Sequence, residues 1–235
     1  MFGVNYIFSN IILLLWSGFV LGLAHALDGD HLAAVSSLVS KHKHIKKAVL
    51  SGISWGLGHT TTLVITGFIL LFLKIIIPSK LALSFELLVG LMVISLGIYV
   101  IRDIIVNKKH THIHTHDESM HIHLHSHKEN EEHSHMHKSY AVGLVHGLAG
   151  SAGIMLLVLS TVNSFLLGLF FILIFGAGSI IGMALASSVI SLPYILTSER
   201  LYNWNKGIRY GTGIFSIIFG LFLVIKILFF EGLLF

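Results

Sequence analysis

Six apolar runs divide the chain, and each is about long enough to cross a bilayer. They cover approximately residues 7–38, 48–73, 84–106, 140–162, 165–190 and 208–230. About 20 apolar residues in a helix span the ~30 Å of bilayer hydrocarbon, so the pattern predicts an all-α integral membrane protein with six transmembrane helices. The first run is longer than one straight span needs. Gly22 and Gly29 flank its polar residues, which predicts a tilt, a break or an unwound turn there.

The composition also predicts a membrane protein. Hydrophobic residues make up 54% of the chain and charged residues only 11%, whereas a soluble domain has roughly 25% charged residues. The chain contains no cysteine, which excludes disulfides and thiolate metal ligands. The N-terminal region lacks the basic segment and cleavage site of a signal peptide, so we expect the first span to be retained.

Three pairs of segments recur at nearly the same separation. They are 21–27 with 142–148, 56–60 with 176–180, and Gly90 and Gly97 with Gly213 and Gly220, at offsets of 121, 120 and 123 residues. A duplicated unit of three helices would produce this pattern and would place its two copies in opposite orientations, as in many secondary transporters. We therefore predict two inverted repeats, 1–106 and 140–235, joined by a flexible loop, 107–139. Chance recurrence of glycine and leucine is the alternative.

Lysine and arginine collect on one side of the predicted spans. Twelve of the 15 follow the first, third and fifth runs: Lys41, Lys43, Lys46, Lys47, Arg102, Lys108, Lys109, Lys128, Lys138, Arg200, Lys206 and Arg209. The other side carries Lys74, Lys80 and Lys226. Basic residues favour the cytoplasmic side. We therefore predict a multi-pass cell-membrane protein with both termini outside and the 107–139 loop in the cytosol.

Four ionisable residues interrupt the first apolar run: His25, Asp28, Asp30 and His31. Such side chains are costly in hydrocarbon and mark functional sites, and imidazole and carboxylate groups bind divalent nickel, cobalt and zinc. On a regular helix His25, Asp28 and His31 share one face, so we expect these three as metal ligands. Asp30 joins them only if the turn at Gly29 is unwound. Otherwise Asp30 accepts a hydrogen bond from an imidazole or pairs across the bundle.

Two further histidines lie within apolar runs. His59 falls near the middle of the second run, and we predict that it is a metal ligand or the partner of one, with a structural interhelical role as the alternative. His146 is the repeat counterpart of His25 but lies nearer the cytosolic end of the fourth run. For His146, a relay ligand near the cytosolic mouth and a packing role both stay open.

The 107–139 loop is of low complexity and histidine-rich. It carries 11 of the 17 histidines: His110, His112, His114, His116, His121, His123, His125, His127, His133, His135 and His137. The alternating spacing and the interleaved acidic residues predict a metal-binding tract without a packed core. Zinc, nickel, cobalt and copper(II) all bind imidazole clusters, so we expect this accessory site to have low specificity.

Three segments carry a resemblance to a known family. Residues 25–31, HALDGDH, resemble the H-A-x-D-A-D-H signature of the nickel/cobalt transporter family, and residues 57–60, LGHT, resemble the L-G-H-[ST] element of its next helix. Residues 55–60, WGLGHT, and 146–153, HGLAGSAG, are closer still to the short urease-accessory nickel transporter branch. The resemblance implies nickel or cobalt transport, with these functional positions: His25, Asp28, Asp30, His31 and His59.

We therefore expect a transporter and not an enzyme, one that moves Ni2+ or Co2+ through a site at mid-membrane, most simply as uptake. Nickel or cobalt efflux and zinc transport are alternatives. A membrane metallohydrolase would need a general base of the HExxH kind, which the chain lacks, and a metal sensor or store is a further alternative. We expect no resident cofactor. Expected partners are the transported ion, the lipid bilayer and a cytosolic metallochaperone, but no nucleic acid.

Overall fold

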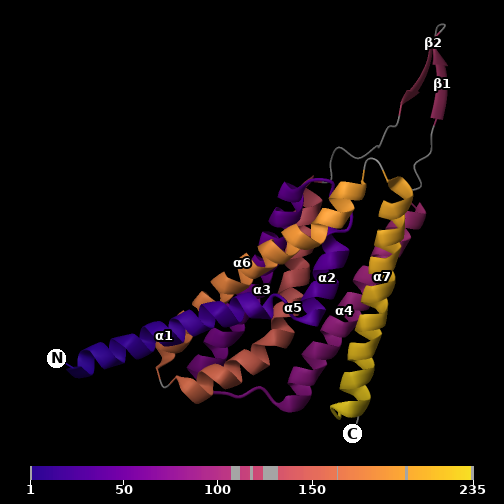
Figure 1. The fold of residues 1–235 in the computed structure, drawn as a ribbon. Helices are drawn as coiled ribbons and strands as arrows, with labels where there is room; N and C mark the ends of the chain where they lie inside the picture. The colour runs from indigo at the N-terminus through magenta and orange to yellow at the C-terminus, as the bar shows by residue number, and fades with distance from the viewer. Residues whose placement is uncertain are drawn as a thin grey trace.

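The computed structural model is a bundle of helices with one small hairpin (Figure 1). It describes residues 2–106, 112–116, 119–123, 132–162, 164–198 and 201–233. The elements in chain order are α1 (Phe2–His25), α2 (Gly29–Val39), α3 (Ile45–Leu73), α4 (Ser79–Val106), β1 (His112–His116), β2 (Ser119–His123), α5 (Glu132–Thr161), α6 (Phe165–Thr197), α7 (Tyr202–Ile225) and the π-helical turn η1 (Lys226–Phe230).

The described helices include four that are long and apolar enough to cross a membrane: α3, α4, α6, and α7 with η1. The bent pair Asn10–His25 and Gly29–Val39 makes a fifth if it counts as one span. Their outward faces are apolar; Phe72, Val189 and Phe230, for example, are 67%, 65% and 82% exposed. The chain is thus an all-helical, multi-pass membrane protein in its main part. The sixth predicted span lies in α5, outside this set, so the count of six stays a prediction.

The first apolar run breaks at its polar residues, as the sequence predicted. α1 ends at His25, α2 begins at Gly29, and the two helices meet at an angle of 57°. The backbone N–H of Asp28 donates to the carbonyl of His25, and Asp28 itself is extended, with φ −61° and ψ 150°. Its carboxylate does not cap α2. The carboxylate is therefore available to a side chain near the break.

Glycines allow α1 to touch α6 and α3 to touch α5. A Cβ at Gly22 would collide with the carbonyl oxygen of Phe175, and one at Gly178 would collide with that of Phe19. In the second pair, Gly143 lies against the carbonyl oxygen of Trp55, and Gly58 against that of Tyr140. Small residues permit this backbone approach between helices in a membrane. The four glycines thereby fix how closely α1, α3, α5 and α6 surround the break.

The short helix α2 lies inside the bundle, between α4, α6 and α7. Ala33 and Ala34 are completely buried, so neighbouring helices pack closely on it. The Ser37 and Ser216 hydroxyls are 2.9 Å apart, and Ser216 also donates to the carbonyl of Ala33 at 3.1 Å. These buried hydrogen bonds join α2 to α7 where no water can replace them. The position of α2 is therefore held by both shape and polar contacts.

The predicted loop contains regular structure. β1 and β2 pair antiparallel, with His112 opposite His123 and His114 opposite His121, and Figure 1 shows this hairpin beyond the helical bundle. α5 begins at Glu132, so its first turns belong to the segment that we expected to be loop. These turns are anchored, because the Ser51 and Ser139 hydroxyls are 2.7 Å apart. The helix therefore starts earlier than the apolar pattern indicated.

Candidate metal centre

Four histidines from four helices meet at the break. His25 ends α1, His31 lies in the first turn of α2, His59 lies midway along α3, and His146 lies midway along α5. The ring centroids of His25 and His31 are 4.5 Å apart, and each is 5.3 Å from that of His59. The ring of His146 lies 4.0 Å from that of His31. The structure therefore brings together residues that are up to 121 positions apart in the chain.

These imidazoles are buried, and several of their nitrogens lack partners. His31, His59 and His146 are at most 1% exposed. Among the described residues, no hydrogen bond reaches His25 Nε2, His31 Nε2 or either nitrogen of His59. Buried polar atoms without partners cost roughly 1–3 kcal/mol each, so a cluster of them at one point indicates a ligand.

One nitrogen from each of His25, His31 and His59 forms a group whose members all lie within 4.8 Å of one another. Nitrogens that bind one metal at about 2.0–2.1 Å lie at most ~4 Å apart. Small side-chain rotations would therefore bring the three onto one ion. We refer to these three residues as the histidine triad.

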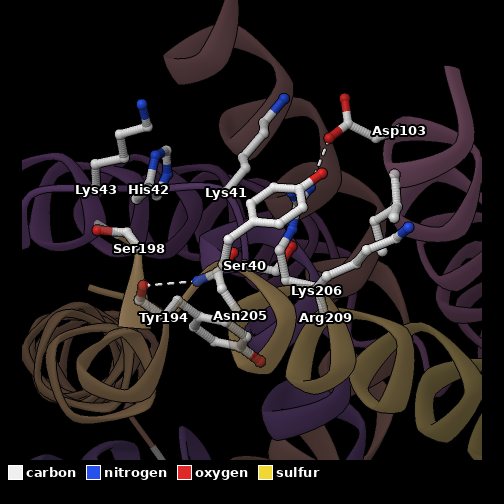
Figure 2. A pocket seen from close by; sticks show the side chains of 12 residues that line it. Ser40, Lys41, His42, Lys43, Asp103, Tyr194, Ser198, Asn205, Lys206 and Arg209 are labelled. Atoms are coloured by element: carbon white, nitrogen blue, oxygen red, sulfur yellow. Dashed lines mark hydrogen bonds and ion pairs between the residues drawn. The ribbon is translucent and has the colours of Figure 1, made fainter. Parts of the chain in front are cut away.

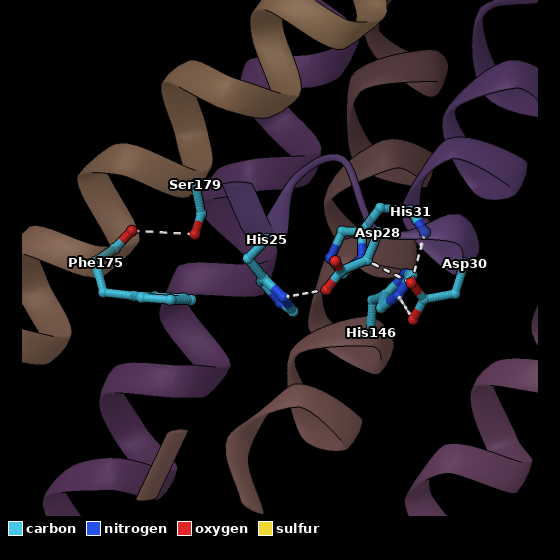
Figure 3. A network of polar contacts seen from close by, with 7 residues as sticks. All are labelled: His25, Asp28, Asp30, His31, His146, Phe175 and Ser179. Carbon is cyan, nitrogen blue, oxygen red and sulfur yellow. Dashed lines mark hydrogen bonds and ion pairs between the residues drawn. The ribbon is translucent and has the colours of Figure 1, made fainter. Parts of the chain in front are cut away.

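Two carboxylates, Asp28 and Asp30, accept hydrogen bonds from ring nitrogens of the histidines (Figure 3). Asp28 Oδ2 lies 2.7 Å from His25 Nδ1. Asp30 Oδ1 lies 3.0 Å from His31 Nδ1, and its Oδ2 lies 3.0 Å from His146 Nε2. A carboxylate on one ring nitrogen fixes the tautomer and leaves the other nitrogen as the donor to a metal. His25 and His31 are thereby arranged to present Nε2 to the triad.

Asp30, His31 and His146 form a second group of potential ligands, again with one atom each within 4.8 Å of the others. In this group the Asp30 oxygens are already used in hydrogen bonds to His31 and His146. Every residue of the histidine triad has an unpartnered nitrogen, whereas in the second group only the two histidines do. The geometry therefore favours the triad as the ligand set and Asp30 as its support.

Aromatic rings and one glycine line the centre. The Trp55 ring lies 5.3 Å from that of His31 and the Phe175 ring lies 5.4 Å from that of His25. A Cβ at Gly150 would come within 3.3 Å of His25 Nε2 and 3.6 Å of the His59 ring. The sequence analysis gave neither aromatic residue a role. Trp55 was detectable, because it precedes His59 by one helical turn, but nothing in the sequence marks Phe175 as a neighbour of α1.

Comparison with known proteins identifies the family. The chain is 36% identical over 224 residues to the urease accessory protein UreH of Bacillus sp. (strain TB-90), an alignment that covers 95% of this chain and 96% of UreH. The chain belongs to the UreH family. This confirms the resemblance to the short urease-accessory branch, a group of accessory proteins and not of enzymes.

More distant relatives are longer. Two Arabidopsis thaliana proteins, chloroplast proteins FOR GROWTH AND FERTILITY 2 and 1, are 25% and 27% identical over 90% of this chain. The chain spans 56% and 58% of their lengths. No protein-family profile matches the chain, and no solved structure matches it.

In this UreH relative, the structure changes the expected place of two residues. We expected His146 near the end of its span, but α5 starts at Glu132, so His146 lies deep in the helix beside His31. We also expected Asp28 on one helical face with His25 and His31. The chain breaks before Gly29, and Asp28, 56% exposed, instead contacts the far side of the His25 ring. Asp30 takes the supporting position that we had given as its alternative.

The accessory histidines are only partly described. His137 is exposed on α5. Five histidines lie in the hairpin strands: His112, His114, His116, His121 and His123. Two more, His133 and His135, lie in the first turn of α5. The side chains of these seven residues are outside the described part of the chain. The whole residues His110, His125 and His127 lie outside the described residues. Metal binding by this tract stays a prediction.

A separate basic pocket lies at the end of the bundle where α2 ends and α7 begins (Figure 2). Its volume is about 110 Å³, and its cationic side chains are Lys41, Lys43, Lys206 and Arg209. Asp103 pairs with Arg209 at 2.5 Å. The pocket has no lining residue in common with the histidine cluster. It marks the strongly basic end of this UreH relative.

Proposed function

We propose that the protein transports divalent nickel or cobalt across a membrane and binds the ion at the histidine triad. The observation that carries the proposal is the convergence of unpartnered, buried imidazole nitrogens, two of them on rings held by carboxylates. Imidazole and carboxylate groups suit borderline divalent metals, and without cysteine the chain has no soft thiolate ligand. The name of UreH, a urease accessory protein, favours nickel among these metals.

The proposed fold for transport is the pair of inverted three-helix repeats. The glycine contacts support this arrangement, because each contact in one pair of helices has an equivalent about 120 residues away in the chain. Gly22 lies against Phe175, and Gly143 lies against Trp55. These are equivalent contacts, since Gly143 follows Gly22 by 121 positions and Phe175 follows Trp55 by 120.

The remaining helices obey the same relation. Gly97 on α4 lies against Gly213 on α7, and Gly220 on α7 lies against Gly90 on α4. These contacts are also equivalent, since Gly220 follows Gly97 by 123 positions and Gly213 follows Gly90 by 123. In such a fold the metal would bind at the repeat interface, where rocking of one repeat on the other exposes it to each side in turn.

The orientation proposed from the sequence places the basic pocket in the cytosol. Lys41, Lys43 and Lys206 line that end, whereas Lys226 lies at the opposite end, with the C-terminus (Figures 1 and 2). The positive-inside rule then puts the termini outside the cell and the hairpin in the cytosol. Uptake would deliver the ion beside the histidine tract and to a cytosolic metallochaperone.

Transport is tested with purified protein in sealed liposomes that contain a nickel-sensitive fluorophore. We expect the wild-type protein to carry nickel. We expect His59→Ala to abolish the flux, because His59 is fully buried, neither of its nitrogens has a hydrogen-bond partner among the described residues, and one of them belongs to the triad. His44→Ala, at an exposed histidine just before α3, is the matched control and should transport normally. Normal nickel flux through His59→Ala at equal protein density would exclude the triad as the transport site.

A further inference from the structure

A cavity connects the metal centre to the end of the bundle opposite the basic pocket. Its volume is about 150 Å³, and it lies between α4, α5 and the end of α7. Asp30 and Gly150 line its inner part, and Glu86 and Lys226 also contribute to its wall. Asp30 is the carboxylate that holds His31 and His146, and Gly150 lies against His25 and His59. The cavity therefore reaches the histidine cluster from the Lys226 side.

Charged side chains occupy the outer end of this cavity. Lys226 Nζ is 2.6 Å from Glu231 Oε1; Lys226 begins the π-helical turn η1, and Glu231 caps its C-terminal end. Glu86 interacts electrostatically with Lys226, Glu231 and Asp30. Glu231 Oε2 is buried and has no hydrogen-bond partner among the described residues. The Lys226 ammonium thus pairs with the Glu231 carboxylate and also interacts electrostatically with that of Glu86.

The opposite end of the bundle has a larger cleft that stops short of the centre. This cleft, about 450 Å³, lies between α2, α4 and α5, and Ser37, Ser51 and Tyr99 are among its lining residues. In the described part of the chain, no histidine or aspartate of the metal centre lines it. Of these two cavities, only the one on the Lys226 side reaches a residue of the metal centre, Asp30.

We propose that the structure is the outward-open state of the transporter, that the cavity is the access route for the ion, and that Glu86 is the first carboxylate the ion meets. The proposal rests on the transport function proposed above. A dication is attracted to the carboxylates of the route more strongly than the monovalent Lys226 ammonium is. The arriving ion therefore competes with the Lys226 ammonium for the carboxylates of the route, and Lys226 regains them when the ion has moved on to the triad. In this way Lys226 keeps the route electrostatically balanced while no ion occupies it.

The absence of cysteine allows a direct test of the route in the full-length protein. Leu223 lines the cavity, whereas its neighbour Phe222 is 58% exposed on the outer, apolar surface. We expect Leu223→Cys to react with a membrane-impermeant, positively charged thiol reagent applied to intact cells, and nickel to slow this reaction. Phe222→Cys in lipid should not react. Reaction of Leu223→Cys only in inside-out vesicles, or in neither preparation, would overturn the proposal.

The role of Glu86 is tested by transport kinetics. An acidic group that concentrates a cation at a cleft raises its association rate by 10-fold or more. We therefore expect Glu86→Gln to raise the KM for nickel about tenfold while the maximal rate stays within about twofold. Lys226→Met, which removes the competing ammonium, should lower the KM. Lys80→Met, a lysine at the same end that does not line the cavity, is the matched control.

The two proposals fail in different ways. If the wild-type protein neither binds nor carries nickel, the transport function is wrong, although Leu223→Cys would still report whether the cavity is open to the outside. If the wild-type protein carries nickel but Glu86→Gln has unchanged kinetics and Leu223→Cys is unreactive from outside, the access route alone is wrong. Membrane abundance and gel-filtration profile are matched for every variant. A second substitution, Glu86→Asp, keeps the charge and should keep a KM close to that of the wild-type protein.

Discussion

Replacement of Asp30 by asparagine should weaken metal binding more than the same replacement at Asp28. Asp30 contacts two buried imidazoles, with 3.0 Å from Oδ1 to His31 Nδ1 and 3.0 Å from Oδ2 to His146 Nε2. Asp28 contacts only His25. Asparagine keeps the size of aspartate but has one acceptor oxygen and one amide donor. Asp30→Asn can therefore accept a hydrogen bond from only one of the two imidazoles.

The size of the effect follows from these contacts. Loss of the carboxylate behind a metal-binding histidine lowers metal affinity about 10–100-fold, which is ~1.4–2.8 kcal/mol. Asp30→Asn disturbs two rings that are each 1% exposed, so we expect a loss of about 100-fold. The Asp28 side chain is 56% exposed, and solvent screens its charge. For Asp28→Asn we expect a loss of about tenfold.

The assay needs a background without most of the histidine tract, because the tract is expected to bind metal of its own. Residues 110–130 are replaced by a short glycine/serine linker, and each aspartate variant is made in that background. The nickel Kd of the detergent-purified protein is measured by competition with a chromogenic chelator. His44→Ala, exposed before α3, should bind nickel like the background.

Three results would contradict this reasoning. An unchanged Kd in Asp30→Asn would mean that the carboxylate does not organise the imidazoles. Loss of binding as complete as in His59→Ala would mean that Asp30 is itself a ligand, as in the second group of potential ligands. A larger loss in Asp28→Asn than in Asp30→Asn would reverse the order derived from burial and hydrogen bonding.

Three further changes test other parts of the structure. Gly150→Ala should lower nickel affinity and flux, because its methyl group would lie 3.3 Å from His25 Nε2. The control is Gly153→Ala, whose added Cβ would have no atom within 4 Å. Equal nickel binding by the two variants would contradict the contact between Gly150 and His25. Gly143→Ala should destabilise the protein by about 1–3 kcal/mol, since the new Cβ would collide with the Trp55 carbonyl. Its unfolding in detergent is compared with that of Gly207→Ala, where the added Cβ meets nothing; equal stability would refute the close approach of α3 and α5. Replacement of 110–130 by a linker should lower the metal bound per protein yet preserve flux at saturating nickel, and loss of that flux in folded protein would make the tract part of the pathway. The replacement ends before α5 because Ser54 donates to the carbonyl of Met136 and the Ser51 and Ser139 hydroxyls bond, contacts that hold α5 on α3.

Local properties of the chain were sufficient for several features. Hydropathy and the lack of charge predicted the long helices, because a backbone in hydrocarbon must satisfy its own hydrogen bonds. The length of the first apolar run and the glycines Gly22 and Gly29 predicted a tilt, a break or an unwound turn there, and the structure contains a break. The cost of ionisable groups in lipid also singled out His25, His31 and His59 before any contact between helices was known.

The tertiary structure decided how these residues are combined. Helical periodicity placed Asp28 with His25 and His31, but that geometry holds only for an unbroken helix, and the break turns Asp28 to the far side of the His25 ring. The packing of α5 on α3 brought His146 to Asp30, and the packing of α6 on α1 brought Phe175 to His25. Hydropathy shows that a helix is apolar but not which neighbour it packs against or at what height. Here the glycine contacts, together with the serine hydrogen bonds that hold α2 on α7 and α5 on α3, determine which distant side chains share the metal centre.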